Sequence, residues 1–438
     1  MMKYAIKFFL IFMNKIIEII LSPLSFLLIF TFSLAVRVIS FGNNKPRLVW
    51  GEAPIINNVY WSRAMRQCGF PSETFTDSYC SSINKREEYD LVIQEMFLKT
   101  PLLFKYYFAF VYSLFKYDIF FISFNGFFLH NTIFKNLEPH FLKLSGKKII
   151  VIPFGGDAFI YSRVKSTNLM HALNTSLPRS SRKQLNISKR VDMWNQYAHV
   201  VIPGVMGPDG LGRWDVLSPS ILCLDLGLWK KSKKKNPSDG TKKVVKISHS
   251  PNFRGFKGSE FVINAVEVLQ KEGLKVELVL LEGVQNEVVR KFLFEDVDIH
   301  VEQIIATGHG LSGLEGMASG LPTVSNLEDE TYTLPMRRWS YFQECPLVSA
   351  SPETLVTVLR KLIKRPDLRR ELGRAGREYV EKYQSFSSVQ FLFKEVIASL
   401  NDQNRFCKLN QLYHPLLGKY LADKPKISHP LFNNQILD

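Results

Sequence analysis

A glycine-rich turn followed by a short helix is the stretch best suited to bind an anion. The apolar run 297–305 predicts a strand, and the turn GHGLSG occupies 308–313. In such a strand–turn–helix unit the first backbone N–H groups of the helix point at the ligand, and the helix dipole favours negative charge. The candidate binding groups are the backbone of Gly310, Ser312, Gly313 and Leu314 and the carboxylate of Glu315, which is expected in the first turn and can accept two sugar hydroxyls. Taken alone, the pattern also fits a tight strand-to-helix connection.

Two cations stand at the entrance of another predicted helix. The segment 246–258 ends a strand and opens a helix whose apolar residues recur at helical spacing. Arg254 and Lys257 lie at its start, so two positive charges join the backbone N–H groups of a helix N-terminus. Arginine can fork across two oxygens and lysine acts as a point charge, so the pair suits a diphosphate.

The order and spacing of these motifs resemble a known family. They comprise an Arg-x-x-Lys-Gly turn at 254–258, a Glu-Gln pair after a strand, and Gly-x-x-x-x-Glu-x-Met-Ala-x-Gly-x-Pro at 310–322. From about Val244 to Val380 the sequence resembles the C-terminal half of retaining glycosyltransferases of the family 4 type (glycosyltransferase group 1). The likeness is looser over the N-terminal half. It implies an α/β protein of the GT-B fold, with two Rossmann-like domains that face each other across a cleft.

The resemblance also implies roles for these residues. A nucleotide-diphosphate sugar would be held mainly by the C-terminal domain, where Arg254 and Lys257 would neutralise the diphosphate and Glu315 would hold the ribose. Because two cations and a helix N-terminus can stabilise the leaving diphosphate, neither a metal nor a cofactor is expected. The family is generally described as reacting by front-face attack, so no protein nucleophile is expected either. His249 could help to shape the site, but a structural role is favoured for it.

Two departures from the family pattern concern acidic residues. The family's first glutamate would stand eight positions before Glu315, where this chain has Thr307. The sugar hydroxyl contact that the missing glutamate would make is therefore in doubt. One branch of the family has an Asp-Gln pair where this chain has Glu302-Gln303, which is a conservative change.

Two glycine-containing turns in the N-terminal half are candidates for the acceptor side. A predicted strand at 47–50 ends at Gly51, and in the family's first loop a glycine lets the backbone approach the reacting sugar; a plain turn fits as well. The strand 148–152 runs into Gly155, Gly156 and Asp157, where the family often has His-Gly-Ser-Asp. Open α/β sheets bind ligands at the carboxyl ends of their strands, so Asp157 is the candidate for acceptor contact. The predicted catalytic residues are therefore Arg254, Lys257 and Asp157. Capping of the following turn by Asp157 is the alternative.

The apolar N-terminal segment, residues 4–41, is interpreted as a membrane attachment. Over 4–20 the polar side chains fall on one helical face, which is typical of an interfacial amphipathic helix. The uncharged run 24–36, which follows Pro23, is too short for a comfortable span on its own. The two pieces fit one kinked membrane helix, or an in-plane helix followed by a shallow re-entrant one. A cleaved secretory signal is the alternative.

The charge of the chain suggests an anionic partner. The 438 residues carry a formal net charge of +16, but no recognition-helix, zinc or RNA-binding signature accompanies them. No nucleic acid is therefore expected, and an anionic membrane surface is favoured. The basic stretch 163–190 fits a solvated loop or a flap that rests on lipid phosphates. Five scattered cysteines without metal-ligand spacing indicate reduced thiols and a cytoplasmic globular part.

A lysine-rich linker marks the clearest domain boundary. The predicted parts are a membrane segment 1–42, an N-terminal Rossmann-like acceptor domain 43–229, a linker 230–243, a C-terminal Rossmann-like nucleotide-sugar domain 244–385, a crossover helix 386–400 and a tail 401–438. Further helices are predicted at 57–67, 101–115, 352–363 and 366–383, and further strands at 117–123, 197–203 and 276–281. The length suits two domains with full cores.

The sequence therefore predicts a membrane-associated, metal-independent retaining glycosyltransferase. It would move a sugar from a nucleotide-diphosphate sugar to a lipid-linked or membrane-proximal glycan, in the biosynthesis of cell-surface polysaccharide. Two alternatives stay open. One is a nucleotide-sugar epimerase of the same fold. The other is a degenerate, non-catalytic member that serves as an assembly partner, which Thr307 keeps in view.

Overall fold

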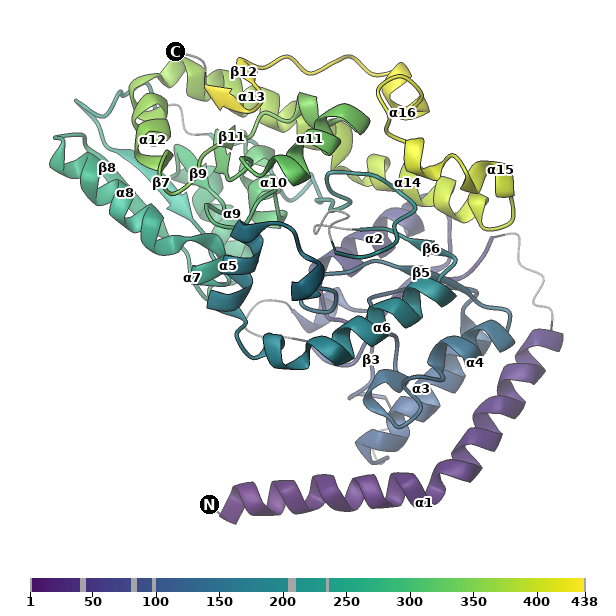
Figure 1. Ribbon diagram of the computed structural model, residues 1–438. Coiled ribbons are helices and arrows are strands. Elements are labelled where there is room, and N and C mark those ends of the chain that lie inside the picture. The colour runs from purple at the N-terminus through teal and green to yellow at the C-terminus, as the bar shows by residue number, and fades with distance from the viewer. Residues whose placement is uncertain are drawn as a thin grey trace. The chain divides into compact units, whose positions relative to one another are not determined.

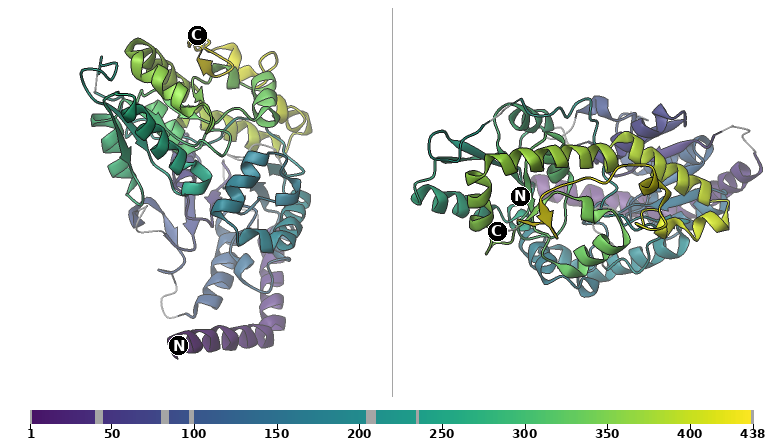
Figure 2. Two further views of the ribbon diagram at one scale, coloured as in Figure 1. Left: turned by 60° about the vertical axis from the view of Figure 1, so that its left-hand side comes forward. Right: turned by 90° about the horizontal axis from the view of Figure 1, so that it is seen from above.

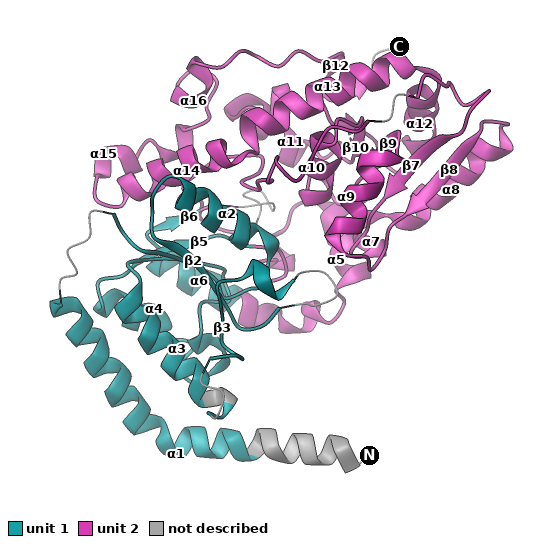
Figure 3. Ribbon diagram, turned by 180° about the vertical axis from the view of Figure 1, so that it is seen from behind, with its two compact units in different colours: residues 1–81, 85–153, 188–201 teal, residues 82–84, 154–187, 202–438 magenta. Residues whose placement is uncertain are grey.

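The chain divides into two compact units, which Figure 3 shows in two colours. The computed structural model describes residues 2–39, 45–79, 85–96, 100–203, 210–233 and 236–436, and within these the side chains of all but 2–12, 102 and 103. Unit 1 comprises residues 1–81, 85–153 and 188–201, and unit 2 comprises 82–84, 154–187 and 202–438. The domain boundaries drawn from the sequence stay predictions.

Unit 1 is built on a six-stranded parallel sheet. The strand order β3-β2-β1-β4-β5-β6 is that of a dinucleotide-binding Rossmann sheet. All four residues of β4 are buried, as expected where helices cover both faces of a parallel sheet. The strands are β1 (Leu48–Trp50), β2 (Ser72–Thr76), β3 (Leu91–Val92), β4 (Ile119–Ile122), β5 (Lys148–Val151) and β6 (Val200–Val201).

The helices of unit 1 pack on an aromatic core. Trp50 of β1 stacks on Phe121 of β4 with ring centroids 3.8 Å apart, and Phe120 meets Phe127 edge-on at 5.2 Å. The helices are α1 (Met2–Val38), α2 (Ile56–Gln67), α3 (Leu102–Lys116), α4 (Glu138–Leu144) and α6 (Gln184–Tyr197), the last of which begins in unit 2. Helix α1 continues through Pro23 as one bent helix (Figures 1 and 2) and packs against α3 and α4.

Unit 2 is built on a five-stranded parallel sheet in the order β11-β10-β9-β7-β8. β7, the first strand of this sheet along the chain, therefore lies between β8 and β9. From β7 the chain crosses to β8 on one side, and it then returns to β9 and adds β10 and β11 on the other side. The strands are β7 (Val245–His249), β8 (Val276–Leu280), β9 (Ile299–Val301), β10 (Thr323–Ser325) and β11 (Val348–Ser349). The helices are α5 (Thr167–Ser176), α7 (Arg254–Lys257), α8 (Ser259–Lys271), α9 (Asn286–Glu295), α10 (Leu311–Ala318), α11 (Glu330–Trp339), α12 (Leu355–Lys364), α13 (Pro366–Tyr383), α14 (Phe386–Ser399), α15 (Gln403–Phe406) and α16 (Lys419–Ala422).

Most predicted elements are confirmed, with shifted ends. The helix predicted at 366–383 is α13, and the strand predicted at 297–305 is confirmed only over β9, Ile299–Val301. The loop interpretation of 163–190 is wrong, because η3 (Tyr161–Arg163), α5, η4 (Ser180–Lys183) and the start of α6 occupy most of it. Its role as a flap on lipid phosphates stays a prediction.

The C-terminal segment 401–436 is folded rather than a plain tail. A hairpin of β12 (Leu431–Phe432) and β13 (Gln435–Ile436) turns at two asparagines with positive φ, as expected of a tight hairpin turn. Asn434 O accepts a 2.7 Å hydrogen bond from Ser349 N of β11, and Asn434 Nδ2 donates to the Cys345 carbonyl at 2.8 Å. These bonds fix the hairpin beside the last strand of the sheet.

Candidate functional site

The carboxyl ends of β7 and β9 form the candidate site of unit 2. In open sheets of this kind, ligands bind at the carboxyl ends of two neighbouring strands from which the chain continues in opposite directions across the sheet. Here these strands are β7, which is followed by β8, and β9, which is followed by β10. Helix α7 follows β7, whereas Glu302, Gln303 and then α10 follow β9 (Figure 1). The sequence thus places its two predicted anion-binding loops at one switch point.

Lys257 is held at this switch point by two acceptors. Its Nζ lies 3.2 Å from Glu302 Oε1 and 2.9 Å from Gln303 Oε1, and the residue is only 8% exposed. The one-turn helix α7 that carries the lysine ends at Gly258, which has a φ of 71°. A Cβ there would lie 3.0 Å from Ile305 Cγ1, so glycine is needed both for the left-handed backbone and for the close approach.

The carboxylate of Glu302 occupies the N-terminus of α10. Gly310 N donates a 2.6 Å hydrogen bond to Glu302 Oε1, and Glu302 is 1% exposed. Its Oε2 has no hydrogen-bond partner among the residues that the structure describes. A Cβ at Gly313 would overlap this oxygen, and one at Gly310 would lie 2.8 Å from Oε1. The glycines therefore make room for an anion, and in the structure a protein carboxylate takes that place.

Arg254 is exposed but is not free of partners. Its guanidinium forks across Glu282, with both donor–acceptor distances 2.8 Å, and also donates to Glu260 Oε1 at 2.7 Å. These carboxylates raise the pKa of Arg254, and the hydrogen bonds from Arg254 lower the pKa of Glu282. To bind Arg254, a diphosphate would have to replace both carboxylates as the hydrogen-bond acceptor.

Glu315 lies in the second turn of α10, not in the first turn as the sequence suggested. The helix begins at Leu311, inside the glycine-rich turn rather than after it, so Glu315 is its fifth residue. The side chain is buried, and Oε1 accepts a 2.8 Å hydrogen bond from Asn286 Nδ2 at the start of α9. Desolvation raises the pKa of Glu315 to about 8, and nearby Glu302 adds to this effect.

Two buried histidines tie the loops to the strands below. Ser312 Oγ lies 3.0 Å from His300 Nε2, and His300 Nδ1 lies 2.8 Å from Ser248 Oγ. His249 Nδ1 donates to the carbonyl of Val301 at 2.9 Å, so its Nε2, 2.9 Å from a serine hydroxyl, acts as the acceptor there. Burial lowers the pKa of His249 to about 4 and of His300 to about 3, so both rings are neutral. This geometry agrees with the structural role favoured for His249.

The predicted acceptor-side residues have structural tasks of their own. Asp157 Oδ1 accepts hydrogen bonds from Phe154 N at 3.0 Å and Gly155 N at 2.9 Å, so it does cap its own turn. In unit 1, a Cβ at Gly51 would overlap the Phe75 carbonyl oxygen of β2. Gly156 has open space where its Cβ would be. The acceptor contacts of Gly51, Gly155, Gly156 and Asp157 stay predictions.

An Asp-x-Asp sequence at 296–298 lies at the opposite end of β9. Asp298 Oδ2 accepts from Lys246 N at 2.8 Å, and Asp296 Oδ2 accepts from Lys246 Nζ at 2.7 Å. These aspartates hold the start of β7, away from the carboxyl edge. Within the described part of the chain, no group of three or more His, Cys, Asp or Glu side chains could hold a metal ion. Metal independence stays a prediction.

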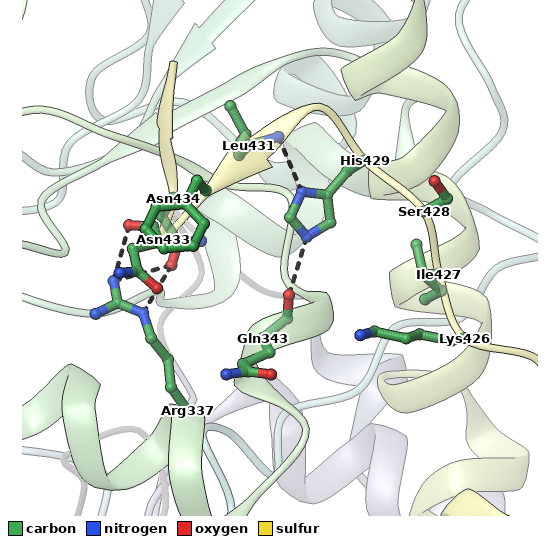
Figure 4. Close-up of a pocket in the computed structure, with 10 residues that line it drawn as sticks. Arg337, Gln343, Lys426, Ile427, Ser428, His429, Leu431, Asn433 and Asn434 are labelled. Carbon is green, nitrogen blue, oxygen red and sulfur yellow. Dashed lines mark hydrogen bonds between the residues drawn. The ribbon is translucent and has the colours of Figure 1, made fainter. Parts of the chain in front are cut away.

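A cavity of about 450 Å³ lies under the returning C-terminal segment (Figure 4). Arg337 donates to Asn433 O at 3.0 Å and to Asn434 Oδ1 at 3.1 Å, and His429 Nε2 lies 3.0 Å from the Gln343 carbonyl. None of the predicted site residues lines this cavity. Because the polar groups that line this cavity hold the hairpin in place, the switch point of the unit 2 sheet stays the better candidate for the functional site.

Comparisons with known proteins support the architecture. No family model matches the chain, and no curated protein matches it by sequence. An alpha-glucosyltransferase solved with UDP and a 13-mer DNA has a TM-score of 0.51 at 12% identity, over 81% of this chain and 99% of that chain. HepE from Anabaena, solved with UDP-glucose, has a TM-score of 0.50 at 11% identity, over 80% of this chain and 99% of that chain. The chain has the GT-B fold.

Within this GT-B fold, the structure brings most of the predicted donor residues together. Lys257 Nζ would lie 3.7 Å from a Cβ at Gly310, and the charges of Lys257 and Glu302 both act on Glu315. The sequence interpretation named Glu302 but not its pairing with Lys257, and it missed Glu260, Glu282 and Asn286. A signal existed, because Glu282 and Glu302 both follow the carboxyl end of a strand, where site residues collect.

Proposed function

We propose that this chain is a retaining glycosyltransferase that takes a sugar from a nucleoside-diphosphate sugar, without a metal or a cofactor. One observation carries the proposal. A buried lysine, a glycine-lined helix N-terminus and a buried glutamate meet at the switch point of the unit 2 sheet. Few ligands need a cation, aligned N–H groups and a carboxyl group at once, and a nucleoside diphosphate is one that does.

In this proposal the donor replaces the internal carboxylates. The diphosphate would take the place of Glu302 beside Lys257 and Gly310 N, and Arg254 would turn from Glu282 to the phosphate oxygens. A ribose hydroxyl would bond to Glu315. The acceptor oxygen then forms a bond to the anomeric carbon as the bond from that carbon to the diphosphate breaks. The acceptor proton leaves with the diphosphate, whose charge the cations and the helix N-terminus stabilise.

The acceptor in this proposal is a lipid-linked or membrane-proximal glycan. The apolar α1 supports it, because its stretch 13–38 is long and apolar enough to cross a membrane. The formal net charge of +16 suits an anionic membrane surface. We place the globular part in the cytoplasm, where nucleotide sugars are made, and the reaction in cell-surface polysaccharide synthesis.

The test is nucleotide binding by the purified full-length chain, with UDP first because both structural neighbours were solved with uridine nucleotides. A site saturated at 100 times Kd stabilises the folded state by about 2.7 kcal/mol. We expect a thermal shift with one nucleoside diphosphate that Lys257→Ala abolishes. Lys271→Ala, an exposed lysine at the end of α8, is the matched control. No shift with any nucleoside diphosphate would contradict the proposal.

A non-catalytic nucleotide-binding partner is the second candidate, and Glu302 favours it. A carboxylate that fills the anion position, together with Thr307 in place of a glutamate, is what a degenerate site would retain. Binding of the donor without release of nucleoside diphosphate, in the presence of membrane-extracted acceptors, would identify this case. Release of free sugar without any acceptor would instead identify the epimerase.

A further inference from the structure

Helix α1 packs a stripe of mainly polar side chains against the rest of unit 1 and leaves most of its large apolar side chains exposed. The inward stripe repeats at spacings of three and four residues and is buried or half-buried: Glu18, Ser22, Ser25, Ile29, Ser33 and Val36. The outward residues include Ile19, Ile20, Leu24, Leu27 and Leu28, which are 61%, 69%, 57%, 59% and 48% exposed. A helix on a water-soluble domain has the opposite orientation. The surface of α1 therefore fits an apolar partner.

Glu18 fixes α1 to unit 1 at one end of this stripe. The residue is 3% exposed, and its Oε1 accepts hydrogen bonds from Ile133 N at 2.7 Å and from the Tyr107 hydroxyl of α3 at 2.9 Å. Lys15 Nζ lies 3.3 Å from the other oxygen. A buried carboxylate with a backbone N–H partner 115 residues away in sequence is a specific tertiary contact, not a feature of a helix that leaves the domain.

Aromatic contacts continue the docking along the helix. The ring of Phe26 lies 5.7 Å from Phe141 of α4, and that of Phe32 lies 5.9 Å from Phe115 of α3. Val36, 4% exposed, ends the buried stripe. Along the helix axis, which bends near Pro23, the path from Glu18 to Val36 is about 27 Å, close to the roughly 30 Å of a bilayer's hydrocarbon core. Unit 1 thus accompanies α1 over the whole length that a span would need.

This docking conflicts with a membrane-spanning helix. If α1 crossed a bilayer while docked, the segment around Ile133 that binds Glu18, and helix α4 that packs on α1, would enter the hydrocarbon core with their exposed Lys135 and Lys143. A charged side chain is strongly unfavourable there. A helix that lies along the membrane surface avoids this cost, because only its outward face enters the lipid.

We infer that α1 is an in-plane helix that stays docked on unit 1 and inserts its outward face into one leaflet of a lipid bilayer. The partner is the bilayer itself. Lys15 and Arg37 flank the apolar stretch of α1 and are both exposed, so anionic headgroups can meet them, although Lys15 also pairs with Glu18. The inference does not depend on which reaction unit 2 performs.

The first test measures binding of the full chain to vesicles of three parts phosphatidylcholine and one part phosphatidylglycerol. The double substitution Ile20→Asp with Leu27→Asp should lower the vesicle partition coefficient by about tenfold or more, since burying each side chain contributes over 1.4 kcal/mol. The control is Leu416→Asp with Leu417→Asp, two leucines of unit 2 that are 86% and 61% exposed. It should bind like the unchanged chain. Equal binding by both double variants would refute the inference, and so would a dimer that buries α1 and ignores vesicles.

The second test separates in-plane attachment from a span. A protease site is added at each end of the chain, and the protein is reconstituted into sealed vesicles. In-plane attachment leaves both ends on one side of the bilayer, so each molecule is cut at both sites or at neither. A span puts the ends on opposite sides, so each molecule is cut once. Single cutting would overturn the inference even if the first test succeeds.

Discussion

Replacing Glu302 with glutamine should destabilise the folded protein and strengthen its binding of nucleoside diphosphates. Glu302 Oε1 lies 3.2 Å from Lys257 Nζ, and both residues are buried. At an effective dielectric constant of about 20, two unit charges at this separation attract by about 5 kcal/mol. A diphosphate must displace that attraction before it reaches the lysine. Glutamine removes the charge, yet its amide oxygen can still accept the hydrogen bond from Gly310 N.

Only part of the attraction between Lys257 and Glu302 should appear as tighter binding of UDP. Gln303 Oε1 stays on Lys257, 2.9 Å away, and the displaced carboxylate regains hydration. If about a third is recovered, UDP should bind the Glu302→Gln protein about 10- to 30-fold more tightly, since 1.4 kcal/mol is tenfold. The unliganded protein should lose about 1–3 kcal/mol of its unfolding free energy, because a buried lysine loses its charged partner.

Titration calorimetry with UDP and denaturant unfolding measure the two quantities separately. The matched control is Glu277→Gln in β8, which removes a carboxylate whose side chain is 53% exposed. It should change neither quantity by more than a few tenths of a kcal/mol, as surface substitutions usually do. If Glu302→Gln bound UDP as weakly as the unchanged chain, or more weakly, competition by Glu302 would be refuted. A role for Glu302 in holding the donor would then be indicated.

Three further predictions concern single side chains. Because burial raises the pKa of Glu315 to about 8 from 4.5, its contribution to stability is full below pH 4.5 and is lost as the pH rises toward 8. The unfolding free energy should fall about 2 kcal/mol less between pH 6 and pH 8 in Glu315→Gln than in the unchanged chain. Gly313→Ala, whose methyl would overlap Glu302, should cost about 1–3 kcal/mol in denaturant unfolding, whereas Gly156→Ala meets nothing within 4 Å and should not. Glu18→Ala should cost about 1–3 kcal/mol in the same assay, because it leaves a buried N–H and a buried hydroxyl without their acceptor.

Sequence patterns predicted the long periodic elements and the glycine-rich turn at the start of a helix. Pro366 opens α13, where Leu368 and Leu372 recur at helical spacing, and the glycines of 308–313 do lie at the N-terminus of α10. Short strands were harder to see. The strand β2, SETFT, has one apolar residue, yet four of its five residues are buried. Local sequence carries no trace of that tertiary burial.

The pairing of charges could not be predicted from the sequence. Nothing near Lys257 indicates Glu302, which lies 45 residues further along the chain and reaches the lysine only because β7 and β9 are neighbours. Arg254 and Glu282 meet for the same reason, through the pairing of β7 with β8. Motif spacing indicates which groups could contact a ligand, whereas sheet order decides which of them contact one another when no ligand is bound.

This self-pairing has a consequence for selectivity. A ligand that offers one anionic group only matches what Glu302 already supplies to Lys257 and Gly310 N, so it gains little by entering. In the proposed function, a diphosphate would bind that pair with one phosphate and reach Arg254 with the other, and its ribose would bond to Glu315. The internal carboxylates would then favour ligands with two linked phosphates. The same competition keeps a buried lysine neutralised in the empty protein, where an unpaired charge would be costly.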